Sequence, residues 1–392
     1  MPNSPRKLTA TFERFFESEK SSGIVLLACT AFSLLLANSA WGTTYLAMWD
    51  ASFAGISLGH AINDGLMAIF FLMIGLELKR ELINGELSNL NTALLPLIAA
   101  LGGVAVPALI HLSLNRGLLT QPGIGIPMAT DIAFALGALA ILGKSIPTSL
   151  KVFVMAFAVI DDLCAIIVIA VFYSHDITEL YLGGVAIMWI ALFMMNRAFK
   201  INQMWPYLLA GTLLWYCMLR SGVHATVAGV ITAFALPFSA QQDDAASVSH
   251  RLENLLHRPV AFGILPLFAL SNTGVVIAAN WAGELASSNS LGIMIGLIAG
   301  KPIGITLACF AAVSVGLCKL PGDLRWSHVI GAGMLGGIGF TMSIFITNLA
   351  FDASPSLINS SKMAILLASF LAGVLGLLWL RLFAKPQTAS TS

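Results

Sequence analysis

Apolar runs about as long as a lipid bilayer is thick recur along nearly the whole chain. A helix needs about 20 apolar residues to cross the hydrocarbon core of a bilayer, and twelve such segments fit into the 392 residues. The sequence therefore predicts an all-α, polytopic membrane protein with about twelve transmembrane helices. The predicted spans are 23–38, 58–80, 92–115, 122–143, 150–173, 181–197, 204–220, 223–238, 258–278, 290–317, 328–350 and 362–384.

Composition excludes several other classes of protein. Only 10% of the residues are charged, whereas ordinary soluble proteins carry about a quarter. The net charge of +1, without a basic patch, predicts no nucleic-acid partner. The five cysteines stand singly, so neither a disulfide framework nor a zinc site is predicted. We expect residues 1–392 to form one integral membrane domain without a cofactor.

The segment before the first span has a pattern of its own. It lacks the short apolar stretch and cleavage site of a secretory signal, so we expect it to be retained. Phe12, Phe15 and Phe16 stand at helical spacing. An amphipathic segment over residues 8–22 is therefore predicted to lie on the membrane surface.

Basic residues are distributed unevenly among the predicted connections. Cytoplasmic connections of membrane proteins carry an excess of Lys and Arg. With the N-terminus inside, only Arg116, Arg220 and Lys362 of the 20 basic residues fall in outer connections, and only Lys301 falls inside a span. Both termini are therefore predicted to be cytoplasmic.

Charged side chains within the spans are the strongest functional signal. Each costs about 2.5–3.5 kcal/mol at the bilayer centre, yet Asp161 and Asp162 lie near the middle of one span. Adjacent helical residues point about 100° apart, so one carboxylate can meet a fixed partner while the other faces a water-filled cavity. Two carboxylates this close oppose each other's ionisation, which suits a pair that trades a proton for a cation. A structural pair of hydrogen-bonded acids is the alternative.

Two further charged residues lie within spans. An unpaired Lys301 would lose its proton or move to the surface, so its expected partner is one of the mid-span aspartates. That bridge can be a static contact between two helices or part of a transport site. Asp64 lies about two turns below the outer surface and is a candidate for lining the access route.

Two spans contain residues that interrupt helices. Proline and glycine crowd the first half of GIGIPMATDIAFALGAL, and four glycines fall within seven residues of AGMLGGIGFTMSIFI. Such glycines are often only close-packing positions, but two spans of this kind predict broken helices around an ion site. Asp131 would then neutralise half-helix N-termini and Lys301 half-helix C-termini. Thr130 adds a neutral oxygen.

A charge cluster marks the cytoplasmic end of the second span. Glu77, Arg80 and Glu81 stand at spacings of three and four, which by itself is the pattern of an ordinary interfacial cluster. His250 and Glu253 lie just before the ninth span and reach the same face.

Seven ordered segments resemble the NhaA family of bacterial sodium/proton antiporters, over about residues 10–384. They are FFLMIGLELKRE, MATDIAFALGAL, VIDDL, SGVHATVAGV, LPLFALSNTGV, GKPIG and GGIGFTMSIFI. The resemblance implies two inverted repeats, at approximately 92–173 and 290–384, with two discontinuous helices that cross at the site. It also implies a location in the bacterial inner membrane. The outer connection 39–57 would be a β-hairpin that joins two protomers into a homodimer.

The resemblance also implies roles for single residues. Asp162 would be the principal Na⁺ ligand, and Asp161 would either share the ion or bridge Lys301. Thr130 and Asp131 would belong to the crossing of the broken helices.

A pH-sensing region is also implied by the resemblance. It would comprise Glu77, Arg80, Glu81 and Glu253. A lysine is common in the family at the position of His250, so we expect the pH of activation to differ here.

Together these residues predict a secondary antiporter that exports Na⁺ or Li⁺ in exchange for inward H⁺, with alternating access to buried aspartates. A Na⁺-coupled symporter of organic anions with a related broken-helix fold is the main alternative. A cation channel would need a repeated filter or a charged ring, and neither is visible. An intramembrane protease would need a GxGD or GxSG segment, and the sequence contains neither.

Overall fold

The computed structural model describes residues 10–53, 55–174, 178–238 and 247–383, and within them helices dominate. The helices of the first half are α1 (Ala10–Ala37), α2 (Gly42–Asp50), α3 (Leu58–His60), α4 (Met67–Ile83), α5 (Leu90–Asn115), α6 (Ile132–Leu142), α7 (Thr148–Phe172), α8 (Glu179–Arg197) and α9 (Met204–Ser221). Those of the second half are α10 (Val227–Ala235), α11 (Val248–Pro259), α12 (Leu265–Asn272), α13 (Trp281–Leu285), α14 (Ser288–Ile295), α15 (Lys301–Ser314), α16 (Trp326–Gly336), α17 (Phe340–Ala350) and α18 (Pro355–Phe383).

Short segments with other hydrogen-bonding patterns join or extend these helices. The 3-10 segments are η2 (Glu86–Ser88), η3 (Gln121–Met128) and η4 (Gly143–Ser145), and the π segments are η1 (Ala61–Leu66), η5 (Val260–Ile264) and η6 (Gly296–Gly300). Two strands, β1 (Ser52–Phe53) and β2 (Ile56–Ser57), pair antiparallel, with Ser52 opposite Ser57 and Phe53 opposite Ile56.

The apolar helices agree with an all-α membrane protein. Within the described residues, seven helices are long and apolar enough to cross a membrane, or up to nine if each bent pair counts as one span. The seven are Leu58–Ile83, Thr92–Asn115, Gln121–Leu142, Thr148–Phe172, Glu179–Arg197, Ser288–Ser314 and Pro355–Phe383. The bent pairs join residues 21–37 to α2 at 114° and α16 to α17 at 45°.

The predicted span over 223–238 is too long. The helix there, α10, has only nine residues, about 14 Å at 1.5 Å per residue. Gly222 takes the left-handed conformation with φ +83° and ends α9, and the chain then turns before α10 starts. Leu236 is extended, as the residue before a proline prefers to be.

The ninth predicted span, 258–278, is displaced along the chain. A continuous helical path runs through α11, η5 and α12, so it starts at Val248 and ends at Asn272. Residues 273–278 are not helical. Thr273 instead turns its hydroxyl back to the carbonyl of Ala269, at 2.7 Å.

The predicted β-hairpin of the connection 39–57 is present but short, and it follows a helix that was not predicted. Residues 42–50 form α2, and the ladder is confined to two residues on each strand. The helical spacing puts the rings of Tyr45 and Trp49 edge to face, with centroids 5.8 Å apart. Tyr45 is buried and its hydroxyl donates to the carbonyl of Leu270 at 2.6 Å, so this packing favours the helix.

The predicted surface segment 8–22 is not separate from the first span. Residues 8 and 9 lie outside the described residues, and from Ala10 onward the chain continues as α1 without a break to Ala37. A helix of 28 residues is about 42 Å long. It is longer than the hydrocarbon core is thick, so part of α1 lies beyond it.

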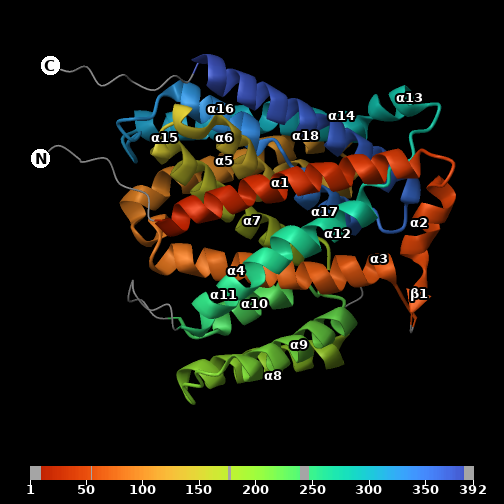
Figure 1. Cartoon of the computed structure of the whole chain (residues 1–392), viewed down its shortest axis with the longest axis vertical. Helices are drawn as coiled ribbons and strands as arrows, with labels where there is room; N and C mark the ends of the chain where they lie inside the picture. The colour runs from red at the N-terminus through yellow and green to blue at the C-terminus, as the bar shows by residue number, and fades with distance from the viewer. Residues whose placement is uncertain (1–9, 54, 175–177, 239–246, 384–392) are drawn as a thin grey trace, which may run out of the picture.

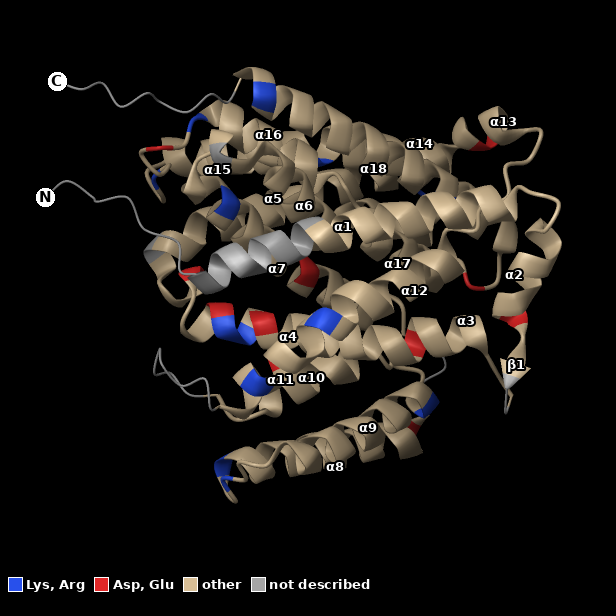
Figure 2. Ribbon diagram, in the orientation of Figure 1, with Lys and Arg blue, Asp and Glu red and all other residues tan. Residues whose placement is uncertain are grey.

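The helices run side by side between two ends (Figure 1). We call one the α2 end, because α2 and the β1–β2 ladder lie there. The helical path from Leu58 to Ile83 starts directly after β2, so Arg80, in its last turn, lies at the opposite end, the Arg80 end. The α8–α9 pair lies along one side of the bundle. Charged residues gather mainly toward the two ends of the ribbon, and an acidic position on α7 is one of few in the middle (Figure 2).

Candidate functional site

Two interrupted helices meet in the interior of the bundle. The chain is extended at Ala129 and Asp131, between η3 and α6, and it is bent between α16 and α17. The two breaks bond to each other, since the backbone N–H of Asp131 donates to the carbonyl of Ile338 at 2.6 Å. Both predicted interruptions are thus present, and they lie in contact.

Asp131 caps two helix N-termini at once. Its Oδ1 accepts from the backbone N–H of Phe134, at 3.1 Å, in the first turn of α6. Its Oδ2 accepts from the backbone N–H of Thr341, also at 3.1 Å, and from the Thr341 hydroxyl at the start of α17. A carboxylate at helix N-termini offsets the partial positive charge of the free N–H groups. Thr341 was not among the predicted site residues.

Lys301 has the partner that its burial requires. Its Nζ donates to Oδ2 of Asp161 and to Oγ1 of Thr130, each at 2.6 Å. Neither the Lys301 nor the Asp161 side chain is exposed. The Thr130 hydroxyl in turn donates to the carbonyl of Gly336 at 2.8 Å, at the C-terminal end of α16. Through the hydroxyl of Thr130, Lys301 is thus linked both to the break before α6 and to the C-terminal end of α16.

Asp162, the next residue on α7, faces a cavity and not the ion pair. The cavity has a volume of about 30 Å³, and about 10–15 Å³ suffices for one water molecule. Among the described residues, no hydrogen-bond donor reaches Oδ1 of Asp162, although this atom is buried. The side chains that line the cavity include Glu77, Asp131, Asp162, Leu265, Thr341 and Met342.

The acidic residues around the cavity are spread out. In the described part of the chain, no three His, Cys, Asp or Glu side chains lie close enough to hold a metal ion together. An ion beside Asp162 would therefore complete its shell with water, hydroxyl or backbone oxygens, the ligands that alkali ions accept as hard cations.

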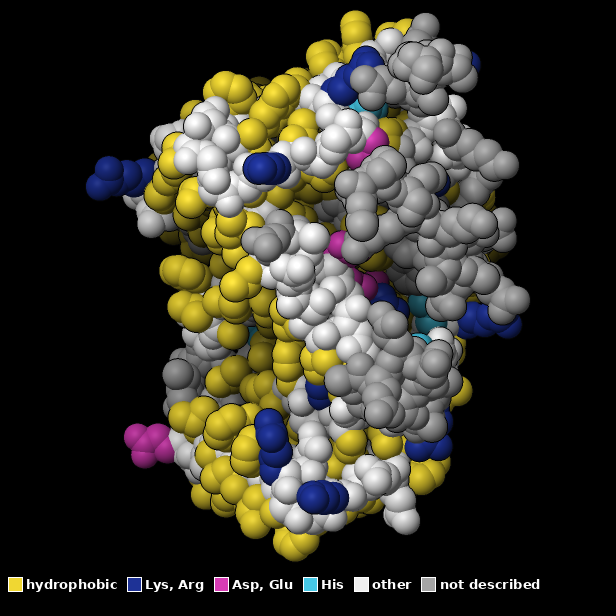
Figure 3. All heavy atoms as spheres, turned by 90° about the vertical axis from the view of Figure 1, so that its left-hand side faces the viewer, with side chains coloured by type: hydrophobic (Ala, Val, Ile, Leu, Met, Phe, Trp, Pro, Cys, Tyr) yellow, Lys and Arg dark blue, Asp and Glu magenta, His cyan; other side chains and the backbone are white. Residues whose placement is uncertain are grey.

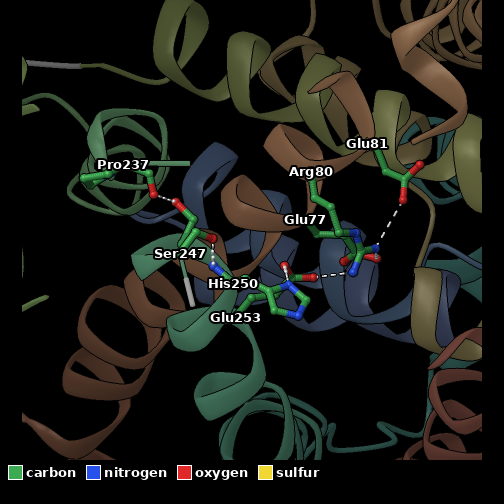
Figure 4. Close-up of polar contacts among 8 residues, drawn as sticks. Glu77, Arg80, Glu81, Pro237, Ser247, His250 and Glu253 are labelled. Atoms are coloured by element: carbon green, nitrogen blue, oxygen red, sulfur yellow. Dashed lines mark hydrogen bonds and ion pairs between the residues drawn. The ribbon is translucent and has the colours of Figure 1, made fainter. Parts of the chain in front are cut away.

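The charged residues at the Arg80 end form one cluster (Figure 4). Arg80 binds Glu253 through Nη1 at 2.5 Å and Glu81 through Nη2 at 3.2 Å. Its Nη2 lies 3.8 Å from Oε1 of Glu77. His250 Nδ1 lies 4.0 Å from Oε2 of Glu253. The structure therefore brings the five predicted residues together from α4 and α11.

Glu77 joins this cluster to the cavity. It is buried, lines the cavity with Asp162 and faces Arg80 on its other side. The Glu77 side chain thus lies between Arg80 and the cavity, so a change of charge at Arg80 acts on a residue that lines the cavity.

Lys79 caps the C-terminal end of α10. Its Nζ donates to the carbonyls of Phe234, at 2.9 Å, and of Ala233, at 3.4 Å, and it also bonds the carbonyl of Leu236. Carbonyls at a helix C-terminus lack partners within the helix.

Asp64 lies apart from the other predicted residues. Its carboxylate is 3.6 Å from Nε2 of His60, and its side chain is 25% exposed. It does not line the cavity. The structure places it toward the α2 end, away from Asp162.

The structure combines a helical bundle of several apolar spans with two helix breaks in contact and a buried carboxylate beside a small cavity. These features define the class of multi-pass membrane ion transporters. A family model described as Na⁺/H⁺ antiporter 1 matches residues 13–380. The chain belongs to this family, and the resemblance seen in the sequence is confirmed.

Individual relatives match over nearly the whole chain. A Na⁺/H⁺ antiporter NhaA of Dechloromonas aromatica is 60% identical over 385 residues, which cover 98% of this chain and 99% of the relative. A Na⁺/H⁺ antiporter NhaA of Cytophaga hutchinsonii is 55% identical over 384 residues, 98% of each chain. One of Vibrio parahaemolyticus is 45% identical over 380 residues, 96% of this chain and 98% of the relative.

Proposed function

We propose that this protein exports Na⁺ or Li⁺ across the bacterial inner membrane in exchange for inward H⁺, and that Asp162 carries the exchanged ion. The observation that supports this most is the position of Asp162, whose buried Oδ1 has no donor among the described residues and which lines a cavity of about 30 Å³. A carboxylate there holds either a proton or an alkali ion. Na⁺, Li⁺ and H⁺ are cargo, and no resident cofactor takes part.

Asp161 has a different role from its neighbour. The Lys301 ammonium compensates its charge at 2.6 Å, so Asp161 stays ionised and fixes α7 to α15. The negative charge that titrates then sits on Asp162. Binding of Na⁺ displaces the Asp162 proton, and a proton that arrives from the other side displaces Na⁺.

Asp131, Thr130 and Thr341 hold the crossing in place. They bond the two helix breaks to each other, and Asp131 and Thr341 also line the cavity. Movement of this crossing relative to the helices on the other side of the cavity gives the site alternating access. Asp64 lines the route on the outer side.

The transporter crosses the membrane twelve times, and its whole chain, 1–392, is one transport domain. The eighth crossing combines α10 with the extended residues after it. Lys79 bonds the carbonyls of Phe234, near the end of α10, and of Leu236, just after it, as backbone at membrane depth requires. Residues 92–173 and 290–384 are inverted repeats. Support comes from the one interrupted helix that each contains, η3–α6 and α16–α17.

The Arg80 end and both termini of the chain face the cytoplasm. Figure 3 looks onto this end and shows Lys and Arg side chains spread over it. Basic residues favour the cytoplasmic side. The α2 end is then the outer end.

Two further properties belong to the proposal. The cluster of Glu77, Arg80, Glu81, His250 and Glu253 adjusts exchange to cytoplasmic pH, because Glu77 belongs to both the cluster and the cavity. Two protomers associate through residues 39–57, where Trp41 is 72% exposed and Ile56 is 51% exposed.

The symporter alternative is disfavoured by size. A cavity of about 30 Å³ holds one or two water molecules and is too small for an organic anion. Proteoliposomes distinguish the two functions. An imposed pH gradient, acidic outside, should drive Na⁺ export without any organic solute, and Asp162→Asn should abolish it. Na⁺ movement that requires an organic anion and ignores the pH gradient would refute exchange.

A further inference from the structure

Three helical segments each place one residue in three successive layers between the cavity and the α2 end. The cavity layer holds Ile74, Leu265 and Met342. About one turn further on α4, α12 and α17 come Phe71, Phe268 and Phe345, and beyond them come Asn63, Asn272 and Asn348. On α12 and α17 the successive residues are three or four apart and share one helix face. Asn63 lies eight residues before Phe71, on η1, and joins the outermost layer through its bond to Asn272. The three layers therefore line one path from the cavity to the outer end.

The middle layer is aromatic and dry. Phe345 of α17 lies between the other two rings, with its centroid 5.5 Å from that of Phe71 and 6.4 Å from that of Phe268. All three side chains are buried, at 1% exposure or less. A hydrated ion cannot pass such a layer, because it would lose its water and gain no ligand.

The outermost layer is a hydrogen-bonded group of amides with Asn272 at its centre. Nδ2 of Asn272 donates to Oδ1 of Asn63 at 2.8 Å. Oδ1 of Asn272 accepts from Nδ2 of Asn348 at 2.7 Å and from Nζ of Lys362 at 3.3 Å. Asn272 is 4% exposed, whereas the other three side chains are half-buried.

These bonds join two different parts of the bundle. Asn63 and Asn272 belong to η1 and α12, on the side of the cavity that holds Leu265 and Ile74. Asn348 and Lys362 belong to α17 and α18, and α17 also carries Thr341, which binds Asp131 at the crossing. A movement that opens the cavity outward must separate α17 from α12, and it must therefore break the Asn272–Asn348 bond.

We propose that Asn272 is a positioning residue whose bonds to Asn348 and Lys362 keep the outer side of the transport path closed while the site faces the cytoplasm. This rests on the exchange function proposed above. The hydrogen bonds of the amide layer determine how often the three phenylalanine rings separate. The amides themselves do not bind the ion. Lys362 adds a positive charge on the same path, which opposes the passage of Na⁺ while the layer is closed.

The sidedness of the apparent Na⁺ affinity tests this role. When only a fraction of the protein is open to one side, the apparent affinity measured from that side falls by that fraction. Asn348→Ala and Lys362→Met, both at half-buried positions, should therefore lower the KM for outer Na⁺ and raise the KM for cytoplasmic Na⁺. One lost hydrogen bond corresponds to about two- to tenfold in such an equilibrium.

A matched control is available at the same end. Asn38 bonds α1 to the segment after α12 through the carbonyl of Val275 and the N–H of Ile277, both at 2.8 Å, and neither bond involves α17 or α18. Asn38→Ala should leave the ratio of the two KM values unchanged. If Asn348→Ala and Lys362→Met also leave that ratio unchanged, whatever the maximal rate, the proposal is wrong.

A cross-link gives a second test that separates this proposal from the exchange function. Asn272→Cys and Asn348→Cys are combined in a protein whose five native cysteines are replaced. Cross-linking the pair should stop exchange reversibly, while Na⁺ added to the purified protein still releases protons. Full exchange after complete cross-linking would refute the proposed outer closure but not the exchange function. If the protein with its native cysteines releases no protons when Na⁺ is added, the exchange function itself is refuted.

Discussion

Lys301 and Asp161 form an ion pair without exposed surface, with Nζ 2.6 Å from Oδ2. The pair leaves Asp162, the adjacent residue, as the carboxylate that faces the cavity. Adjacent positions on one helix thus have two electrostatic environments, one compensated by a lysine and one open to an ion. The division of labour between the two aspartates follows from this difference.

Removal of the lysine should destabilise the fold as well as transport. Lys301→Met leaves the Asp161 charge buried and unpaired, and breaking a buried pair costs about 3–5 kcal/mol. We expect a clearly lower melting temperature in detergent for Lys301→Met, and recovery of most of it when Asp161→Asn is added. Lys319→Met, at an exposed position, is the control. Unchanged melting of Lys301→Met would contradict the pairing.

The hydroxyl of Thr341 should matter more than its shape. Thr341→Val keeps the volume but removes a donor to Asp131, and a buried acceptor left without its donor costs about 1–3 kcal/mol. We expect lower thermal stability and slower exchange. Thr347→Val is the matched control, because among the described residues that hydroxyl bonds only the Ser343 carbonyl of its own helix, at 2.9 Å. Equal effects of the two substitutions would show that the contact with Asp131 has no special role.

Neutralising Arg80 should move the pH profile of exchange. Without the guanidinium, Glu77 and its neighbours bear an uncompensated negative charge, so protons compete for them up to a higher pH. Arg80→Gln should therefore shift the activation of exchange in everted vesicles to higher pH. Arg381→Gln, an exposed change at the same end, should not. A shift to lower pH in Arg80→Gln would contradict the predicted direction. An unchanged pH profile would show that the cluster does not regulate exchange.

Much of the site could be predicted from the rarity of charge. In a chain that keeps nearly every charge out of its spans, Asp131, Asp161, Asp162 and Lys301 are conspicuous, because lipid makes each of them costly. The glycine and proline clusters likewise marked both helix breaks. What the pattern could not decide is which aspartate meets Lys301, since that depends on how α7 is rotated about its axis.

Other features carried no usable signal. Thr341 is one of many hydroxyls in apolar segments, and only the contact between the two breaks reveals its role. The helical conformation of α2 depends on Tyr45 reaching Leu270, more than 200 residues away along the chain. The shortness of α10 depends on Lys79, which satisfies the carbonyls at its end. Contacts between distant segments are not visible in local spacing.

The most direct measurement is the release of protons when Na⁺ is added to the purified protein in weakly buffered detergent solution. If Asp162 holds either a proton or Na⁺, addition of Na⁺ at a pH where the carboxyl is partly protonated should release protons saturably, and Asp162→Asn should release none. Saturable Na⁺ binding without proton release, or unchanged release from Asp162→Asn, would contradict exchange at this carboxylate.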